Sequence, residues 1–136
     1  MNRVFVDTAA WLALLNTDDV WHSRATSLRS SLIQTNHIFV TTDFVLIEVA
    51  DALCAPKHRK STANFIKQVH HLKSTEVISL SRDLLQLGLK LYSERLDKDW
   101  GLTDCTSFVT MRQQSISLAF TSDKHFEQAG FDRLLK

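Results

Sequence analysis

Short apolar runs alternate along the chain with longer segments in which apolar residues recur at helical spacing. The runs are rich in β-branched and aromatic residues and lack a clean two-residue alternation, which is typical of strands buried on both faces. Five strands are therefore expected, at residues 3–6, 38–41, 76–80, 117–121 and 131–135. Helices are expected between them, at residues 9–15, from an N-cap at Asp18-Asp19, from an N-cap at Asp43 to Pro56, and at 58–73, 82–96, 104–114 and 123–128.

The residues at the ends of these segments support the boundaries. Asp18-Asp19, Asp43 and Ser81 can each accept a hydrogen bond from the first turn of the helix that follows. Pro56 lacks a backbone donor and disfavours helix at the residue before it, so it is expected to close the preceding helix. Gly130 is expected just past the end of the 123–128 helix.

The order of strands and helices predicts a mostly parallel central sheet with helices on both faces. The expected fold is thus a three-layer α/β/α sandwich with about five strands. The 136 residues suffice for one domain, so residues 1–136 are expected to form a single domain. In such sheets, sites form beyond the carboxyl ends of the strands, where the strand order switches direction.

Composition narrows the class of protein further. Apolar residues make up 44% and charged residues 23% of the chain, which excludes a disordered or fibrous protein. The two cysteines, Cys54 and Cys105, are too few for a disulfide scaffold. The longest apolar run, Ala9–Leu15, is too short to cross a membrane, and Asp7 interrupts any signal-peptide core. We therefore expect a cytoplasmic protein that does not associate with membranes.

Four acidic residues occupy places that the predicted sheet brings to one edge. Asp7 ends the first strand, Glu48 follows the second, Asp104 opens the helix before the fourth, and Asp123 follows the fourth. Crowded carboxylates repel one another, and a hard divalent cation such as Mg²⁺ or Mn²⁺ relieves that repulsion through oxygen ligands. The alternative for Asp104 and Asp123 is a helix-capping role alone. The placement of all four acids favours a metal site, which could activate water against a phosphodiester.

Four short segments surround these acids: Val6-Asp7-Thr8, then Thr42 with Glu48, then Leu102-Thr103-Asp104-Cys105-Thr106-Ser107-Phe108, and finally Thr121-Ser122-Asp123-Lys124-His125-Phe126. Together they resemble the PIN domain, and within it the VapC-type toxin nucleases. The resemblance extends over nearly the whole chain. The segments around Asp104 and Asp123 are its most specific parts.

The resemblance implies a metal-dependent ribonuclease with a five-stranded parallel sheet, which is frequently a homodimer. Asp7, Glu48, Asp104 and Asp123 would be both the catalytic residues and the ligands of Mg²⁺ or Mn²⁺. Supporting hydroxyls would come from Thr8, Thr42, Thr103 and Thr121, and the products would carry 5′-phosphate and 3′-hydroxyl ends. Ala9 and Gly101 stand where relatives often have Ser, but neither departure removes an acid.

The resulting hypothesis is an endoribonuclease that acts as the toxin of a type II toxin–antitoxin pair and is blocked by a small antitoxin protein. The alternatives are an RNA-processing PIN nuclease outside such a pair, and a PIN module that binds RNA or protein without catalysis. A haloacid-dehalogenase-type phosphatase needs a second Asp two residues after Asp7, where Ala9 stands. A receiver domain needs an acidic pair near Asp7, which stands alone.

One segment concentrates the positive charge of the chain. Residues 57–73 hold five basic and no acidic side chains, and Lys57, Lys60 and Lys67 fall on one helical face. This face could contact RNA phosphates, dock an acidic partner segment, or simply be solvated. His70-His71 and His125 lack the short spacing of a zinc site, so none is expected to be a metal ligand.

Overall fold

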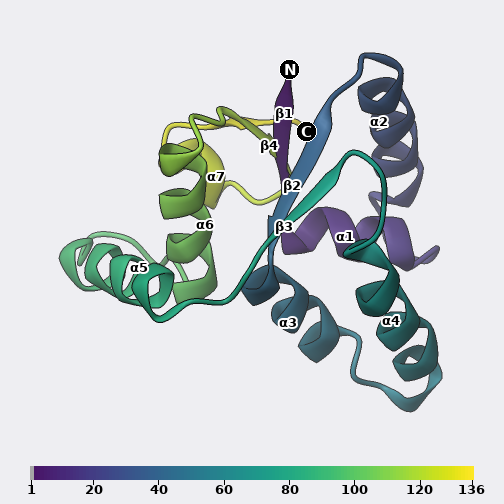
Figure 1. Cartoon of the computed structure of the whole chain (residues 1–136), viewed down its shortest axis with the longest axis horizontal. Helices are drawn as coiled ribbons and strands as arrows, with labels where there is room; N and C mark the ends of the chain where they lie inside the picture. The colour runs from purple at the N-terminus through teal and green to yellow at the C-terminus, as the bar shows by residue number, and fades with distance from the viewer. Residues whose placement is uncertain (1) are drawn as a thin grey trace.

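A computed structural model describes residues 2–136 and contains five strands and seven helices (Figure 1). The strands are β1 (Arg3–Val6), β2 (Ile38–Thr42), β3 (Thr75–Ile78), β4 (Leu118–Phe120) and β5 (Asp132–Arg133). The helices are α1 (Thr8–Leu15), α2 (His22–Gln34), α3 (Asp43–Ala52), α4 (Pro56–Val69), α5 (Arg82–Glu94), α6 (Leu102–Gln113) and α7 (His125–Gln128).

The strands form one parallel sheet in the order β3-β2-β1-β4-β5. Figure 1 shows α1, α2 and α4 on one side of this sheet and α5, α6 and α7 on the other, with α3 beyond the carboxyl end of β2. The three-layer α/β/α fold expected from the sequence is therefore confirmed. The chain leaves β1 toward β2 on one side, whereas β4 lies on the other, so the switch in strand order falls between β1 and β4.

The core lies on both faces of the two central strands. Val4, Phe5 and Val6 of β1 and Phe120 of β4 are completely buried, which explains why these strands read as continuous apolar runs. On one face, Phe126 of α7 stacks on Phe5 with ring centroids 6.3 Å apart. Within residues 2–136, no helix is long and apolar enough to cross a lipid bilayer.

Three of the expected helix boundaries were wrong. Asp19 accepts a hydrogen bond from the backbone of Trp21 in a turn, so α2 begins only at His22 instead of after an Asp18-Asp19 cap. The N-cap of α3 is Thr42, whose hydroxyl accepts from Val45 N at 3.1 Å, and Asp43 is the first helical residue. Pro56 does not close α3, which ends at Ala52; it opens α4, where a missing N–H has no cost.

The remaining boundaries differ by a few residues. Helix α4 ends at Val69 instead of residue 73, and β3 covers Thr75–Ile78 instead of 76–80. Asp104 is the third residue of α6 and accepts from Gly101 N, so it caps the helix from within its first turn. The expected terminal strand is present as β5, with only two residues. The Ser81 cap of α5 is confirmed, with Leu84 N donating at 3.0 Å.

Candidate metal centre at the carboxyl ends of β1 and β4

Asp7 is the buried acid of the site and directly follows β1. Its side chain is 2% exposed, and although it occupies the N-cap position of α1, it makes no capping hydrogen bond. The Thr121 hydroxyl donates to Asp7 Oδ2 at 2.8 Å. The other oxygen, Oδ1, is buried and has no hydrogen-bond partner among the described residues. Burial raises the pKa of Asp7 to about 7, and the negative charges of Asp104 and Asp123 add to that rise.

Asp104 and Asp123 meet above Asp7, together with His125. One side-chain atom from each of these three residues lies within 4.8 Å of the other two. His125 Nδ1 is 3.0 Å from Asp104 Oδ2 and 3.5 Å from Asp123 Oδ1. Burial raises the pKa of Asp104 as well, although the His125 hydrogen bond works in the opposite direction. Two carboxylates and an imidazole thus converge from two chain segments, the first turn of α6 and the residues that follow β4.

Two of the four expected threonines, Thr121 and Thr8, make hydroxyl hydrogen bonds with the predicted acids. Thr121 donates to Asp7 and accepts from Asp123 N at 3.0 Å, so one hydroxyl positions two acids. The Thr8 hydroxyl donates to Glu48 Oε1, which ties α3 to the residue next to Asp7. Thr42 acts more remotely, as the N-cap of α3, the helix that carries Glu48. The hydroxyl of the fourth threonine, Thr103, makes no hydrogen bond among the described residues. Its carbonyl oxygen accepts from the Thr106 hydroxyl at 2.7 Å.

The four acids therefore do not all lie at the same distance from one another. Asp104 and Asp123 form the centre of the site, and Asp7 lies close enough for their charges to act on its pKa. Glu48 is half-buried and is joined to them through Thr8. Its role as a metal ligand stays a prediction, as do the individual ligand roles of the other three acids.

The donor set is suited to a hard divalent cation. Asp7 Oδ1 is a buried carboxylate oxygen without a hydrogen-bond donor, which is costly unless a cation compensates it. Asp7, Asp104 and Asp123 offer oxygen ligands, which Mg²⁺ and Mn²⁺ prefer. The arrangement can hold an ion next to the sheet edge and leave part of its coordination open, because Asp123 and His125 are only half-buried.

Sequence reasoning missed His125 as part of this site. Burial would lower the pKa of His125, but the hydrogen bond to Asp104 and the charges of Asp123, Asp104 and Asp99 outweigh burial and raise it. The His125 position was visible in the sequence, two residues after Asp123 at the carboxyl end of a strand. Spacing among the histidines carries no sign of this role, because the groups around His125 include Asp104 and Asp99, which lie in another segment.

The basic residues of α4 lie apart from the acids. Lys57, Lys60 and Lys67 are all exposed, and none forms an ion pair with the side chains described in residues 2–136. Lys60 and Lys67 line an open cleft between α4 and the end of α3, whose walls include Leu53 and Ile66. Two of the three lysines thus border a groove, which also contains the acidic Asp51, and the three uses considered for this face stay open.

The chain belongs to the PIN domain family, whose pattern matches residues 4–132. Within that family it is similar to the 23S rRNA-specific endonuclease VapC20 of Mycobacterium tuberculosis. The two sequences are 28% identical over 132 residues, which cover 94% of this chain and 95% of VapC20. The chain is therefore homologous to the VapC toxin ribonucleases, as its sequence motifs indicated.

Solved structures support the same assignment. The crystal structure of M. tuberculosis VapC20, described as a sarcin–ricin loop cleaving toxin, matches with a TM-score of 0.87 and 25% identity, over 98% of this chain and 99% of that one. The fold also matches VapBC2 from Rickettsia felis, solved with a promoter DNA fragment, with a TM-score of 0.70 and 13% identity, over 97% and 96% of the two chains. FitAcB from Neisseria gonorrhoeae matches with a TM-score of 0.67 and 14% identity, over 96% of both chains.

Proposed function

We propose that this protein is a divalent-metal-dependent endoribonuclease and the toxin of a toxin–antitoxin pair. The observation that carries the proposal is the buried Asp7, with one unpartnered oxygen, beneath the pair Asp104 and Asp123. A purely structural set of acids would be expected to have protein donors for its buried oxygens. The homology to VapC20 supports RNA as the substrate, and a sarcin–ricin-type rRNA loop is the first RNA to test.

The acids of this site would hold the ion, which is Mg²⁺ or Mn²⁺ in our proposal. When bound, it supplies a neutralising charge for the phosphate and lowers the pKa of a coordinated water. Asp104 and Asp123 would hold the ion from the half-open side, and the buried Asp7 would offer its free oxygen, Oδ1. Thr121 fixes the position of Asp7 relative to Asp123, because its hydroxyl donates to the Asp7 carboxylate and accepts from the backbone N–H of Asp123.

Glu48 has a separate place in this mechanism. It reaches the site from α3, and Thr8 holds its carboxylate by a direct hydrogen bond. We therefore assign Glu48 to ion binding or to water positioning at the outer edge of the site. The other three acids fix the ion.

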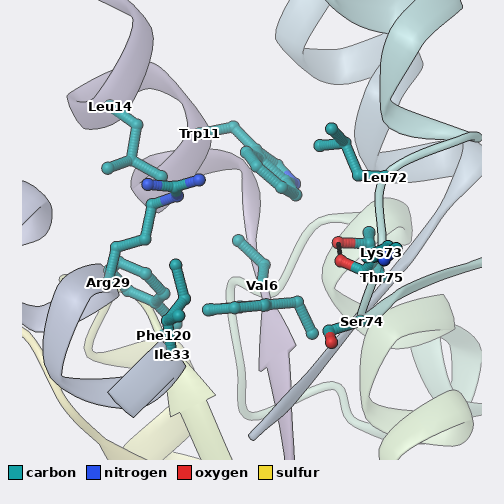
Figure 2. Close-up of a pocket in the computed structure, with 11 residues that line it drawn as sticks. Val6, Trp11, Leu14, Arg29, Ile33, Leu72, Lys73, Ser74, Thr75 and Phe120 are labelled. Atoms are coloured by element: carbon teal, nitrogen blue, oxygen red, sulfur yellow. Dashed lines mark hydrogen bonds between the residues drawn. The ribbon is translucent and has the colours of Figure 1, made fainter. Parts of the chain in front are cut away.

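We also propose a small antitoxin protein as partner, since VapC20 is a toxin and a cell must restrain such an activity. A cleft of about 220 Å³ between α1, α2 and the loop before β3 offers a docking place for it (Figure 2). Apolar side chains line most of the cleft, among them Trp11, Leu14 and Leu72. Arg29 and Lys73 add positive charge, so an apolar side chain flanked by acidic residues is complementary to this cleft.

A second copy of the chain is the partner we propose for α5. The inner side of this helix packs on α6, where Gly88 comes so close to Thr106 that an added Cβ would lie 2.5 Å from the Thr106 methyl group. The outer side is apolar as well, with Leu85, Leu89 and Tyr92 between 39% and 50% exposed. A helix that is apolar on its outer face indicates a protein contact. Leu89→Glu should therefore shift the protein toward monomer in sedimentation velocity, whereas Val20→Glu, at an isolated exposed position, should not.

Both cysteines are free thiols, which is consistent with the reducing cytoplasm that we propose as the site of action. The proposed activity is tested by incubating the purified protein with an end-labelled rRNA loop hairpin. Cleavage should require added Mg²⁺ or Mn²⁺, stop with EDTA, resume when the ion is restored, and leave a 5′-phosphate. Activity that is undiminished in EDTA would contradict the proposed site.

A further inference from the structure

His125 has the geometry of a metal ligand that is oriented by a second residue. Its ring lies between the carboxylate of Asp99 on one side and the carboxylates of Asp104 and Asp123 on the other. Nε2 is 3.2 Å from Asp99 Oδ1, in the loop between α5 and α6. On the other side of the ring, Nδ1 is 3.0 Å from Asp104 Oδ2 and 3.5 Å from Asp123 Oδ1. One nitrogen therefore faces a single carboxylate, and the other faces the centre of the candidate metal site.

This division matches the arrangement in which a ligating histidine donates its second N–H to a carboxylate. Such a hydrogen bond fixes the tautomer and the ring orientation, and it leaves the other nitrogen lone pair for the ion. Asp99 is suited to this task because its side chain is 88% exposed and does not belong to the group of possible ion ligands formed by Asp104, Asp123 and His125. Nδ1 is then the nitrogen that faces Asp104 and Asp123.

The spacing of the three donor atoms agrees with coordination of one ion. Two ligands at right angles on an ion with bonds of 2.0–2.1 Å lie about 3 Å apart. The distance of 3.0 Å from Nδ1 to Asp104 Oδ2 equals this value, and the distance of 3.5 Å to Asp123 Oδ1 is close to it. Asp7, whose pKa the charges of Asp104 and Asp123 raise, has a buried oxygen with no partner within residues 2–136, which is an independent sign that a cation belongs near these acids.

The backbone around His125 is anchored by contacts of its own and of the next residue, and the residue after Asp99 is anchored as well. His125 N donates to Asp123 Oδ1 at 2.9 Å, and the next residue, Phe126, is completely buried against Phe5 and Phe108. Beside Asp99, the indole of Trp100 is buried and donates to Gln128 at 2.9 Å. A preorganised ring of this kind is what a ligand requires.

We propose that His125 Nδ1 is a ligand of the divalent ion, together with Asp104 and Asp123, and that Asp99 positions the His125 ring. The inference rests on the metal site of the proposed function and adds a nitrogen donor to its oxygen ligands. The bound ion takes the place of the Nδ1 proton, which leaves to solvent. Because imidazole favours transition-metal ions over Mg²⁺, the site should accept Mn²⁺ more readily than a site built from carboxylates alone.

Mn²⁺ is also the probe that tests this inference without any measurement of activity. Electron spin echo envelope modulation of the Mn²⁺-loaded protein should show coupling to a ¹⁴N nucleus, and His125→Gln should abolish that coupling. His71→Gln changes an exposed histidine in the turn after α4 and is the matched control, which should retain the coupling. In Mn²⁺ titrations, His125→Gln should weaken binding by about tenfold or more. Asp99→Asn should weaken binding by about tenfold and keep the ¹⁴N signal.

The possible outcomes separate this inference from the proposed function. Mn²⁺ that binds to the wild type and is lost in Asp104→Asn, but shows no ¹⁴N coupling, would leave the metal site in place and overturn the role of His125. In that case His125 is only a positively charged partner for the acids in the ion-free protein, and its replacement by Gln would leave Mn²⁺ affinity unchanged or increase it. If the wild type does not bind Mn²⁺, both the metal site of the proposed function and the ligand role of His125 are overturned.

Discussion

The Thr121 hydroxyl donates to Asp7 Oδ2 at 2.8 Å, and within residues 2–136 the buried Asp7 Oδ1 has no hydrogen-bond partner. Thr121 directly follows β4 and Asp7 directly follows β1, so the contact joins the two strands at the switch in strand order. The pairing of Val6 with Phe120 places these two residues side by side. One carboxylate oxygen is thereby committed to the protein, and the other is available to an ion.

Asp7→Asn should stabilise the protein in the absence of metal. The pKa of Asp7 is raised in the folded protein, from 3.8 to about 7, so ionised Asp7 opposes folding. The contribution of Asp7 to the free energy of unfolding of the wild type is therefore most favourable below about pH 4. It becomes less favourable as the pH rises toward about 7. The gain in Asp7→Asn should grow over the same range, with a ceiling of about 4 kcal/mol.

Denaturant unfolding in EDTA at several pH values measures this gain. The same variant should lose RNA cleavage, because a ligand charge is gone while the shape of the side chain is kept. A variant that unfolds more easily than the wild type at neutral pH would mean that Asp7 has a structural role instead. Added Mn²⁺ should stabilise the wild type more than Asp7→Asn, since the ion binds only the folded site.

Thr121→Val should reduce cleavage by removing the hydrogen bond that orients Asp7 and Asp123. The two side chains have nearly the same shape, so the change leaves Asp7 Oδ2 without a donor in a buried place, at a cost of about 1–3 kcal/mol. Thr121→Ser keeps the hydroxyl and is the matched control, which should retain most of the activity. Equal losses in the two variants would show that packing of the methyl group, and not the hydroxyl, is what the site requires.

His70→Gln should remove a pH-dependent contribution to stability. His70 Nε2 is 3.1 Å from Asp43 Oδ1 and Nδ1 is 2.8 Å from the Ile66 carbonyl oxygen, so both nitrogens face acceptors and both must donate. The Asp43 hydrogen bond, followed by the Ile66 bond, raises the pKa of His70 above 6.5. The stabilisation is therefore fully present below about pH 6.5 and is lost as the pH rises through the higher pKa of the folded state.

Chemical denaturation from about pH 5.5 to about 8.5 tests this contribution. The difference in stability between the wild type and His70→Gln should be largest at the acidic end and shrink toward the alkaline end. His71→Gln, at the next residue, serves as the control. A difference that does not vary with pH would contradict a protonated His70 in the folded protein.

The Lys60→Ala, Lys67→Ala double variant should bind RNA more weakly and by a similar factor for different RNA sequences. Both lysines line the cleft beside α3, and phosphate contacts carry no base information. The salt dependence of binding should flatten by roughly 0.7 for each lost contact with a single strand. Lys90→Ala, on α5, is the control and should leave the slope unchanged. A normal slope with weakened inhibition by the antitoxin would instead make the cleft a partner site, and no change in either would mark a solvated face.

The fold was predictable because the strands at the middle of the sheet, β1 and β4, are apolar runs that helices cover on both faces. Val4, Phe5 and Val6 are fully buried, so their hydrophobicity identifies β1 without further information. The helix ends were harder, because several residue types that cap helices have more than one use. Asp43 looks like an N-cap, but its carboxylate is used by His70 and by Leu80 N, contacts that depend on segments far away in the chain.

The candidate site was predictable as far as strand order determines it. β1 and β4 are parallel neighbours, so their carboxyl ends bring Asp7 and Asp123 to one edge of the sheet, whereas Asp104 reaches this edge from the first turn of α6. The contribution of His125 depends on the loop that brings Asp99 to its ring, 26 residues away in sequence. Periodicity and spacing within one segment carry no information on such a contact, so only the structure reveals it.

The single-turnover rate of RNA cleavage by Asp104→Asn, compared with the wild type at saturating Mn²⁺, tests the central claim most directly. Asp104 accepts hydrogen bonds from Gly101 N and faces His125, and Asn keeps its size while removing the charge that binds the ion. The rate should fall by about 100-fold or more, with an unchanged circular dichroism spectrum and a melting temperature in EDTA that is equal or higher. A folded Asp104→Asn variant that cleaves RNA at the wild-type rate would contradict a catalytic metal centre at this edge of the sheet.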